Sequence, residues 1–325
     1  MPRSAEFTIA STGFDELDWE DGSFAVLPYS GSEHLEESLE RFGMMHPPWI
    51  LRRTDAKAVI VDGFKRLRWL RSRGYEKATC VVFAAGSEGT DVWLRRIEGK
   101  MFESPLNLAE KAQIVARLAE LSDAGGTWRL LLSRLGVSQR PDSIAKWVRL
   151  AACGTALLEA AAAGEICERA AMELLDWEER ARERILVILR ELRCSASIQV
   201  EVIERVGEIA LRDGKTLTAV LDDPDWEAIV RDNGRNHREK TRDLRDLLYR
   251  RRFPRLTART ELFREQAGRL RLPGAARLIP PPSFEGDQWQ LEISFSSASE
   301  LMTLLEEVRS RTEPESLSEV MAPRS

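Results

Sequence analysis

The sequence has few of the residues that build metal centres or disulfide frameworks. It contains three histidines and four cysteines in 325 residues, and the cysteines lie far apart with no Cys-x-x-Cys pair. This scarcity argues against a structural zinc site and against a disulfide-stapled secreted domain. We therefore expect a protein of the reducing cytoplasm with no metal site.

Long apolar runs are also missing. No stretch of about 18 apolar residues is present, so the sequence predicts no membrane span and no membrane partner. The N-terminal MPRSAEFTIAST has neither the apolar core nor the cleavage pattern of a signal peptide. Hydrophobic residues make up 43% of the chain and charged residues 31%, which is typical of a helix-rich globular protein with two or three domains.

Charge is unevenly distributed along the chain, although the net charge is only −5. Residues 1–45 carry ten acidic side chains against two basic ones, and residues 278–325 carry nine against three. Residues 231–277 carry fifteen basic side chains against six acidic ones. Such a basic block can bind a polyanion within an acidic protein, and the alternative is an ordinary solvated helical face.

The residue patterns predict an α+β protein that is mostly helical. Strands are expected at Ser23–Leu27, Pro48–Arg52, Val59–Val61 and Thr79–Phe83, and helices at Ser32–Phe42 and Gly89–Ile97. Helical periodicity then dominates from residue 107 to about residue 276. We divide the chain into an acidic tail (1–22), an αβ domain (23–104), a helical domain (105–235), a basic helical region (236–275) and a C-terminal strand-helix unit (276–325).

A candidate anion site lies in VIVDGFKRLRWLRSRG, residues 59–74. An apolar strand ends at Asp62-Gly63 and opens into a cationic helix. Glycine there permits close approach of the backbone to a ligand, and the amides and dipole of a helix N-terminus favour an anion. Lys65, Arg66 and Arg68 add positive charge. The alternative is a common glycine turn before a solvated basic helix.

A candidate helix-turn-helix spans residues 128–151. One helix is expected at Trp128–Leu135, and a second begins at Pro141 after a turn at Gly136. We expect the core face of the second helix to consist of Ile144, Val148 and Ala151, together with Trp147. The side chains expected to point outward toward bases and phosphates are Gln139, Arg140, Ser143, Lys146 and Arg149. An ordinary helical hairpin is the alternative.

Two further segments are predicted to take part in binding. Arg250, Arg251 and Arg252 form the densest part of the basic block and are expected to contact DNA phosphates, unless they only complement their own helix dipole. In Trp289–Phe295, apolar residues alternate with polar ones, which predicts a strand, and a helix is expected to follow at 297–309. We expect this unit to form a homodimer; the alternative is that its strand pairs with Ala276–Ile279 of the same chain.

Three blocks together resemble the ParB-type chromosome-partition proteins over most of residues 23–212. The resemblance lies in their order and spacing. The blocks are LEESLERFGMMHPPWI (35–50), VIVDGFKRLRWLRSRGYEKATCVVF (59–83), and LNLAEKAQIVARLAEL (106–121) followed by the hairpin and LLEAAAAGEICERAAMELL (157–175). The resemblance implies a ParB/sulfiredoxin-like αβ domain joined to an all-helical DNA-binding domain, and a protein associated with the nucleoid. GDQWQLEISFSSASELMTLLEEV (286–308) is similar to the family's dimerisation unit.

The resemblance also implies a nucleotide site for CTP with magnesium. Gly63, Lys65, Arg66, Arg68 and Glu98 stand at the matching positions. The family's glycine box has a glutamate where this chain has Phe64, an arginine at Lys65 and an alanine at Trp69. In the second box, Glu98-Gly99-Lys100-Met101-Phe102 lacks an asparagine and an arginine of the family pattern. Each lost charged contact is worth about 1.5–3 kcal/mol, so we expect a degenerate pocket with weak or absent CTP hydrolysis and no catalytic residue.

The resemblance leaves the biological role open. The leading hypothesis is a dimeric DNA-binding protein of the partition type, or a transcriptional or nucleoid regulator. An alternative is an enzyme of the same αβ fold acting on nucleotide phosphates, such as a CTPase or a small-molecule kinase, because one fold hosts several functions. A third reading is an adaptor whose acidic N-terminus docks a partner such as a partition ATPase.

Overall fold

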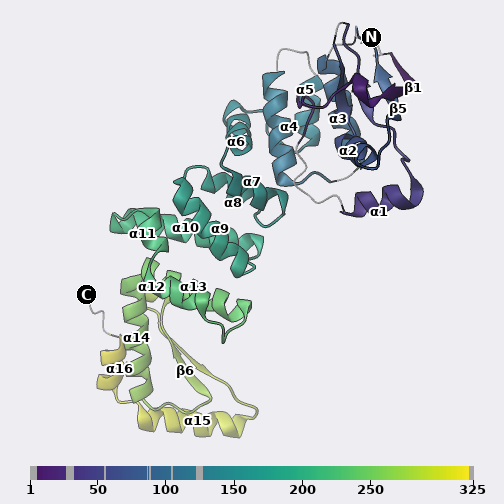
Figure 1. Ribbon diagram of the computed structural model, residues 1–325. Coiled ribbons are helices and arrows are strands. Elements are labelled where there is room, and N and C mark those ends of the chain that lie inside the picture. Colours follow the sequence, from purple (N-terminus) through teal and green to yellow (C-terminus); the bar gives the residue numbers. More distant parts are fainter. Residues whose placement is uncertain are drawn as a thin grey trace.

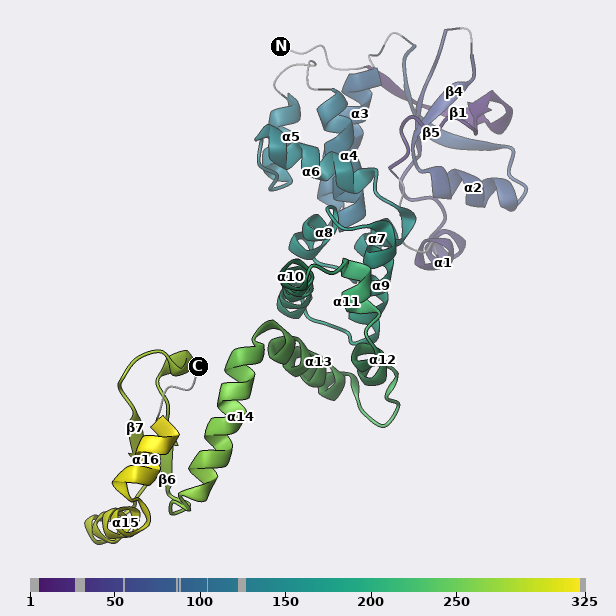
Figure 2. The ribbon, with the colours of Figure 1, turned by 90° about the vertical axis from the view of Figure 1, so that its left-hand side faces the viewer.

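The computed structural model describes residues 6–26, 33–54, 56–85, 87, 89–103, 105–121 and 127–321. The chain is mostly helical and has a five-stranded mixed sheet near its N-terminus, which confirms the predicted fold class. Figure 1 and Figure 2 show the chain passing from this sheet through a helical region to a separate hairpin with helices. Within the described residues, no helix combines the length and apolar character needed to cross a bilayer.

The sheet has the strand order β1-β5-β3-β4-β2. β3 lies parallel to β5 and antiparallel to β4, while β1 pairs antiparallel with β5 along its whole length. The strands are β1 (Phe7–Gly13), β2 (Leu17–Asp18), β3 (Trp49–Leu51), β4 (Ala58–Asp62) and β5 (Lys77–Phe83), and the accompanying helices are α1 (Glu33–Phe42), α2 (Phe64–Ser72) and α3 (Gly89–Glu103).

The two faces of the sheet are covered by different helices. Leu67 and Leu70 of α2 pack on one face, in a cluster that includes Ile60 of β4. On the other face, Val61 belongs to a core that includes Ile97 of α3. The alternation of side chains along β4 therefore places α2 and α3 on opposite faces.

Two predictions near the N-terminus are wrong. Residues 23–26 form a turn and irregular backbone rather than a strand, and Leu27 lies outside the described residues. The predicted acidic tail supplies β1 and β2 instead. β1 was hard to see because its large side chains, Phe7 and Ile9, are exposed while small ones such as Thr12 face inward. The domain boundaries proposed from the sequence remain predictions.

The helical region shares one apolar core with α3. Side chains from Val92 of α3 to Leu248 of α13 belong to this core, which explains the long helical periodicity of the sequence. The helices are α4 (Leu108–Glu120), α5 (Thr127–Arg134), α6 (Pro141–Ala151), α7 (Thr155–Ala162), α8 (Glu168–Leu174), α9 (Glu179–Glu191), α10 (Ala196–Asp213), α11 (Leu217–Leu221), α12 (Pro224–Arg231) and α13 (His237–Arg252).

The C-terminal unit has its own small core. Phe263 and Leu270 pack against Val320, with Phe284 and Trp289 nearby. β7 pairs antiparallel with β6 of the same chain, as in the intrachain alternative. The elements are α14 (Pro254–Arg269), β6 (Ala276–Ile279), β7 (Gln290–Ile293), α15 (Ala298–Arg311) and α16 (Pro314–Met321).

Candidate functional site

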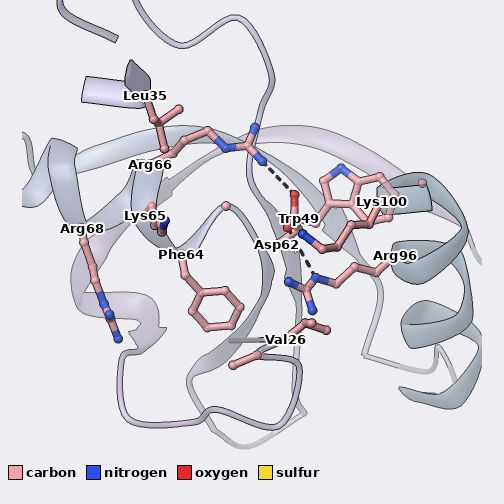
Figure 3. A pocket seen from close by; sticks show the side chains of 13 residues that line it. Val26, Leu35, Trp49, Asp62, Phe64, Lys65, Arg66, Arg68, Arg96 and Lys100 are labelled. Atoms are coloured by element: carbon pink, nitrogen blue, oxygen red, sulfur yellow. Dashed lines mark hydrogen bonds and ion pairs between the residues drawn. The ribbon is translucent and has the colours of Figure 1, made fainter. Parts of the chain in front are cut away.

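A cavity of about 390 Å³ opens where β4 ends and α2 begins, and we call it the Gly63 pocket. α3 forms the opposite wall (Figure 3). Apolar surface comes from Val26, Leu35, Trp49 and Phe64. The cations that line it are Lys65, Arg66 and Arg68 from α2 and Arg96 and Lys100 from α3. This combination suits an anion that also carries an apolar or aromatic part.

Gly63 has a backbone that other residues adopt only with strain. Its φ is +84° and ψ is 23°, and it is the N-cap of α2. A Cβ built here would lie 2.9 Å from Cβ of Pro48 and 3.0 Å from its Cα. The absence of a side chain at Gly63 therefore allows Pro48, in the loop before β3, to lie close to the backbone of Gly63.

The first turn of α2 contains no acidic residue. No acidic side chain of the helix itself therefore neutralises the positive end of its dipole. Lys65 is half-buried in the same turn, and Arg68 is exposed one turn further on. The start of α2 thus provides positive potential at the pocket.

Asp62 balances part of this charge. Its carboxylate accepts a hydrogen bond of 2.7 Å from Nη2 of Arg66 and lies 3.4 Å from Nε of Arg96. Arg66 also donates to the carbonyl oxygen of His46, and the buried Arg96 donates to that of Phe24. An incoming anion would compete with this carboxylate for both guanidinium groups.

Lys100 connects the pocket to the helical region. Its Nζ lies 2.9 Å from a carboxylate oxygen of Glu110, which is buried in the first turn of α4. Glu110 and Asn107 form a reciprocal capping box at this helix start. Lys100 therefore serves both the pocket and the N-terminus of α4.

The sequence predicted the pocket only in part. Gly63, Lys65, Arg66 and Arg68 lie together there, whereas Glu98 does not line the pocket, and their role in nucleotide binding stays a prediction. Its carboxylate forms an ion pair with Arg134 of α5. The prediction missed Trp49, Asp62, Arg96 and Lys100; the spacing of the two cations by four residues on α3 was the available signal.

The pocket fits a phosphate better than it fits a protein-held magnesium ion. Asp62 is the carboxylate among its described lining residues, and two arginines already engage it. Nowhere in the described residues do three His, Cys, Asp or Glu side chains gather in a way that could hold a metal ion. Magnesium would have to be held mainly by phosphate oxygens and water.

The second candidate site is formed by α5, a turn and α6. Gly136 in the turn has a φ of +67°, and Pro141 is the first residue of α6, where a missing N–H costs nothing. α6 packs on α4 through the buried side chains of Trp147 and Leu150. The predicted core face is wrong at Val148, which is 38% exposed.

The predicted DNA-reading side chains differ in their surroundings. Arg140 and Lys146 are exposed, the first at the N-cap of α6 and the second beside its buried face. Gln139 donates to Oγ of Ser133 at 2.9 Å and is held against α5. Ser143 is half-buried, and Nη2 of Arg149 binds the carboxylate of Asp176 at 2.7 Å. Arg140 and Lys146 are thus the side chains best placed to reach a ligand.

The arginine cluster at the end of α13 is largely used within the chain. Arg251 binds the carboxylates of Asp223 and Asp225, and Nε of Arg252 lies 2.6 Å from Glu208. Hydrogen bonds from Arg251 hold the pKa of Asp223 below its usual value. Arg250 is exposed, and its Nε contacts a carbonyl oxygen of its own helix at 3.4 Å. Arg250 is therefore the member of the cluster most open to a ligand.

No family model matches the sequence, and no curated protein matches it. Comparison of structures finds the C-terminally truncated chromosome-partitioning protein ParB from Caulobacter crescentus, complexed to the centromeric parS site, at 15% identity and a TM-score of 0.34. The match covers 65% of this chain and 96% of that chain. The pNOB8-like ParB N-domain matches at 14% identity and a TM-score of 0.35, over 74% of this chain and 91% of that chain.

The chain is thus similar to ParB structures, at low identity. With TM-scores of 0.34 and 0.35, these comparisons assign no ligand to the chain and no role to any of its residues.

Proposed function

We propose that this protein is a ParB-like DNA-binding protein that reads DNA through α5 and α6. The observation that carries the proposal is the exposure of Arg140 at the N-cap of α6 and of Lys146 beside the face that Trp147 and Leu150 bury against α4. Side chains on such a rigid second helix reach base edges in the major groove, while neighbouring cations contact phosphates.

The test begins by selecting the sequences that the full-length protein binds from a random DNA library. Lys146→Ala should weaken binding to the selected duplex by about tenfold and binding to a scrambled duplex much less. Arg180→Ala, which removes an exposed arginine from α9 outside the basic block, is the matched control and should change neither. Equal losses on both duplexes for Lys146→Ala would overturn the assignment of α6 as the reading helix.

Arg250 is proposed to increase the affinity for DNA of any sequence, without contributing to sequence specificity. Arg250→Ala should weaken binding to selected and scrambled DNA alike and lower the slope of log K against log salt by about 1. Arg251 and Arg252 are poor test positions because their loss would remove the ion pairs that Asp223 and Glu208 form with them. An unchanged salt slope would remove Arg250 from the interface.

The Gly63 pocket is proposed to bind a nucleoside triphosphate, with CTP as the nucleotide that the sequence resemblance implies. Cationic side chains and the α2 N-terminus support phosphate binding, whereas Asp62 competes for Arg66 and Arg96. We therefore expect weak binding, and hydrolysis close to background because no uncommitted carboxylate among the described lining residues is available as a base.

Calorimetry with CTP tests the nucleotide proposal. Arg66→Ala should abolish the heat of binding, whereas Arg71→Ala, on the exposed side of the same helix and outside the pocket, should leave it unchanged. Steady CTP turnover in the presence of DNA would contradict the expected lack of hydrolysis. Binding unaffected by Arg66→Ala would place the nucleotide elsewhere.

We further propose that the C-terminal unit joins two copies of the chain. Apolar side chains remain exposed on its outer surface even though β7 is paired with β6: Leu291, Phe295, Met302 and Leu305. A two-fold symmetric contact would cover them in both copies. The proposed partners are therefore DNA and a second copy of this chain.

Light scattering of the full-length protein tests the dimer. The double variant Met302→Glu, Leu305→Glu should be monomeric, and Leu211→Glu, which changes an apolar residue 86% exposed on α10, should stay dimeric. These variants are sharper than a truncation, because deleting residues 286–325 would also remove Trp289 and Val320 from the core around Phe263. A native protein that is monomeric at micromolar concentration would refute the proposal.

A further inference from the structure

β1 forms one edge of the N-terminal sheet. It pairs with β5 on its inner side, and among the described residues no strand pairs with its outer side. Figure 1 shows β1 at the outer limit of this sheet. The opposite edge, β2, has only two residues, whereas β1 has seven. β1 thus presents a long row of backbone donors and acceptors.

β1 also lacks the features that normally protect an edge strand. Its sequence, FTIASTG, contains no charged residue and no proline. Phe7 is 56% exposed and Ile9 is 66% exposed, and the Phe7 ring lies against Phe83 of β5 with centroids 6.0 Å apart. An open backbone edge beside exposed apolar side chains is what an extended peptide needs in order to add a strand.

The ends of β1 are acidic. Glu6 precedes the strand, and the exposed Asp15 and Glu16 follow it. A carboxylate oxygen of Glu16 accepts a hydrogen bond of 3.0 Å from the backbone N–H of Gly13, so this charge is held at the strand end. The cation in register with Gly13, Lys77, lies on β5, one strand further in.

These charges argue against a second copy of this chain as the added strand. In an antiparallel pair of β1 strands centred on Ala10, Glu6 of one copy would lie opposite residue 14 and beside Asp15 of the other. Like charges across such a pair repel. No lysine or arginine occurs between residues 4 and 40. Arg52, Arg53 and Lys57 line a cavity with Glu16, so they can offset charge at that end of the strand but not at Glu6. A strand with basic ends would be attracted instead.

We propose that β1 is a docking strand for an extended segment of another protein, with apolar side chains at alternate positions and lysine or arginine at its ends. The segment continues the sheet beyond β1 through main-chain hydrogen bonds. Its apolar side chains cover Phe7 and Ile9, and its basic ends meet Glu6 at one end and Asp15 and Glu16 at the other.

Two fluorescein-labelled peptides test the proposal by fluorescence anisotropy with the full-length protein. The first is Lys-Val-Thr-Val-Thr-Val-Lys, and the second has glutamate in place of both lysines. The basic peptide should bind about tenfold more tightly than the acidic one, and the difference should shrink as salt is raised. Hydrogen exchange should slow in β1 when the basic peptide is present.

Ile9→Lys should weaken binding of the basic peptide by about tenfold or more, because it places a like charge on the docking face. Because Ile9 is exposed, the circular dichroism spectrum and melting temperature of the Ile9→Lys variant should match those of the native protein. Leu211→Lys, at an exposed apolar position far along the chain on α10, should bind like the native protein.

Three results would overturn the proposal. The first is equal affinity for the basic and the acidic peptide, and the second is Ile9→Lys protein that binds as tightly as the native protein. The third is a native dimer that Ile9→Lys converts to monomer, which would assign the edge to a second copy of this chain.

Discussion

Gly63 and Gly74 allow the close approach at the pocket to be measured separately from backbone strain. Both have positive φ, +84° and +82°, at the two ends of α2. A Cβ at Gly74 would meet nothing within 4 Å, whereas one at Gly63 would lie 2.9 Å from Cβ of Pro48. The left-handed backbone costs an L-residue about 1–2 kcal/mol at either position. Overpacking against Pro48 adds about 1–3 kcal/mol at Gly63 alone.

Gly74→Ala should therefore lower the free energy of unfolding by about 1–2 kcal/mol, and Gly63→Ala by about 2–5 kcal/mol. Urea unfolding followed by tryptophan fluorescence measures both. Because Gly63 also positions Arg66, Gly63→Ala should lose triphosphate binding in calorimetry while Gly74→Ala keeps it. Equal losses of stability in the two variants would refute the close-approach argument, since they share the same backbone strain.

Three other predictions concern the helical region and the buried thiols. Asp223→Asn should destabilise the protein by about 1–2 kcal/mol at pH 7. Arg251 lowers the pKa of Asp223 in the folded state, so the Asp223 carboxylate stabilises the fold fully above the ordinary carboxyl pKa of about 4. This stabilisation is lost as the pH falls through the lowered pKa of the folded state. The urea midpoints of variant and native protein should therefore converge in acid. Trp147→Ala should cost about 3–5 kcal/mol and abolish DNA binding, whereas Val148→Ala should cost less than about 1 kcal/mol; similar melting temperatures would contradict the observed orientation of α6. Burial raises the pKa of Cys80 and of Cys194 to about 11, so iodoacetamide at pH 8 should leave both unmodified in the native protein and modify them in urea, as read by mass spectrometry; rapid native labelling would contradict the buried environment.

Local patterns predicted the elements whose buried side chains follow a simple period. The apolar run at Val59–Val61 and the glycine after it gave β4 and the start of α2, because a strand buried on both faces and a left-handed turn are set by neighbouring residues. β1 was not predicted in this way, because its large apolar side chains point outward and its inward side chains are small. A neighbour, β5, decides which face of β1 is buried, and that neighbour is about 70 residues away in sequence.

The rest of the pocket depends on contacts between distant segments. Arg96 and Lys100 reach the pocket only because α3 packs on the face of the sheet opposite α2.

Contacts between distant segments also decide the state of the basic block, where composition indicated an exposed cationic surface. Asp223 and Glu208 neutralise Arg251 and Arg252, and neither carboxylate is a neighbour in the sequence. Composition counts charges, whereas the fold decides which of them are paired.

The two candidate sites share α3. Lys100 on this helix faces the Gly63 pocket and pairs with Glu110, which caps α4, while Glu98 two residues earlier pairs with Arg134 of α5. An anion in the pocket and the carboxylate of Glu110 would therefore compete for one ammonium group. Since α6 packs directly on α4, the capped start of α4 also belongs to the support of the reading helix. A change of charge at Lys100 thus affects both the Gly63 pocket and the N-terminus of α4. Anion affinity and DNA affinity should therefore both be measured for each variant at this position.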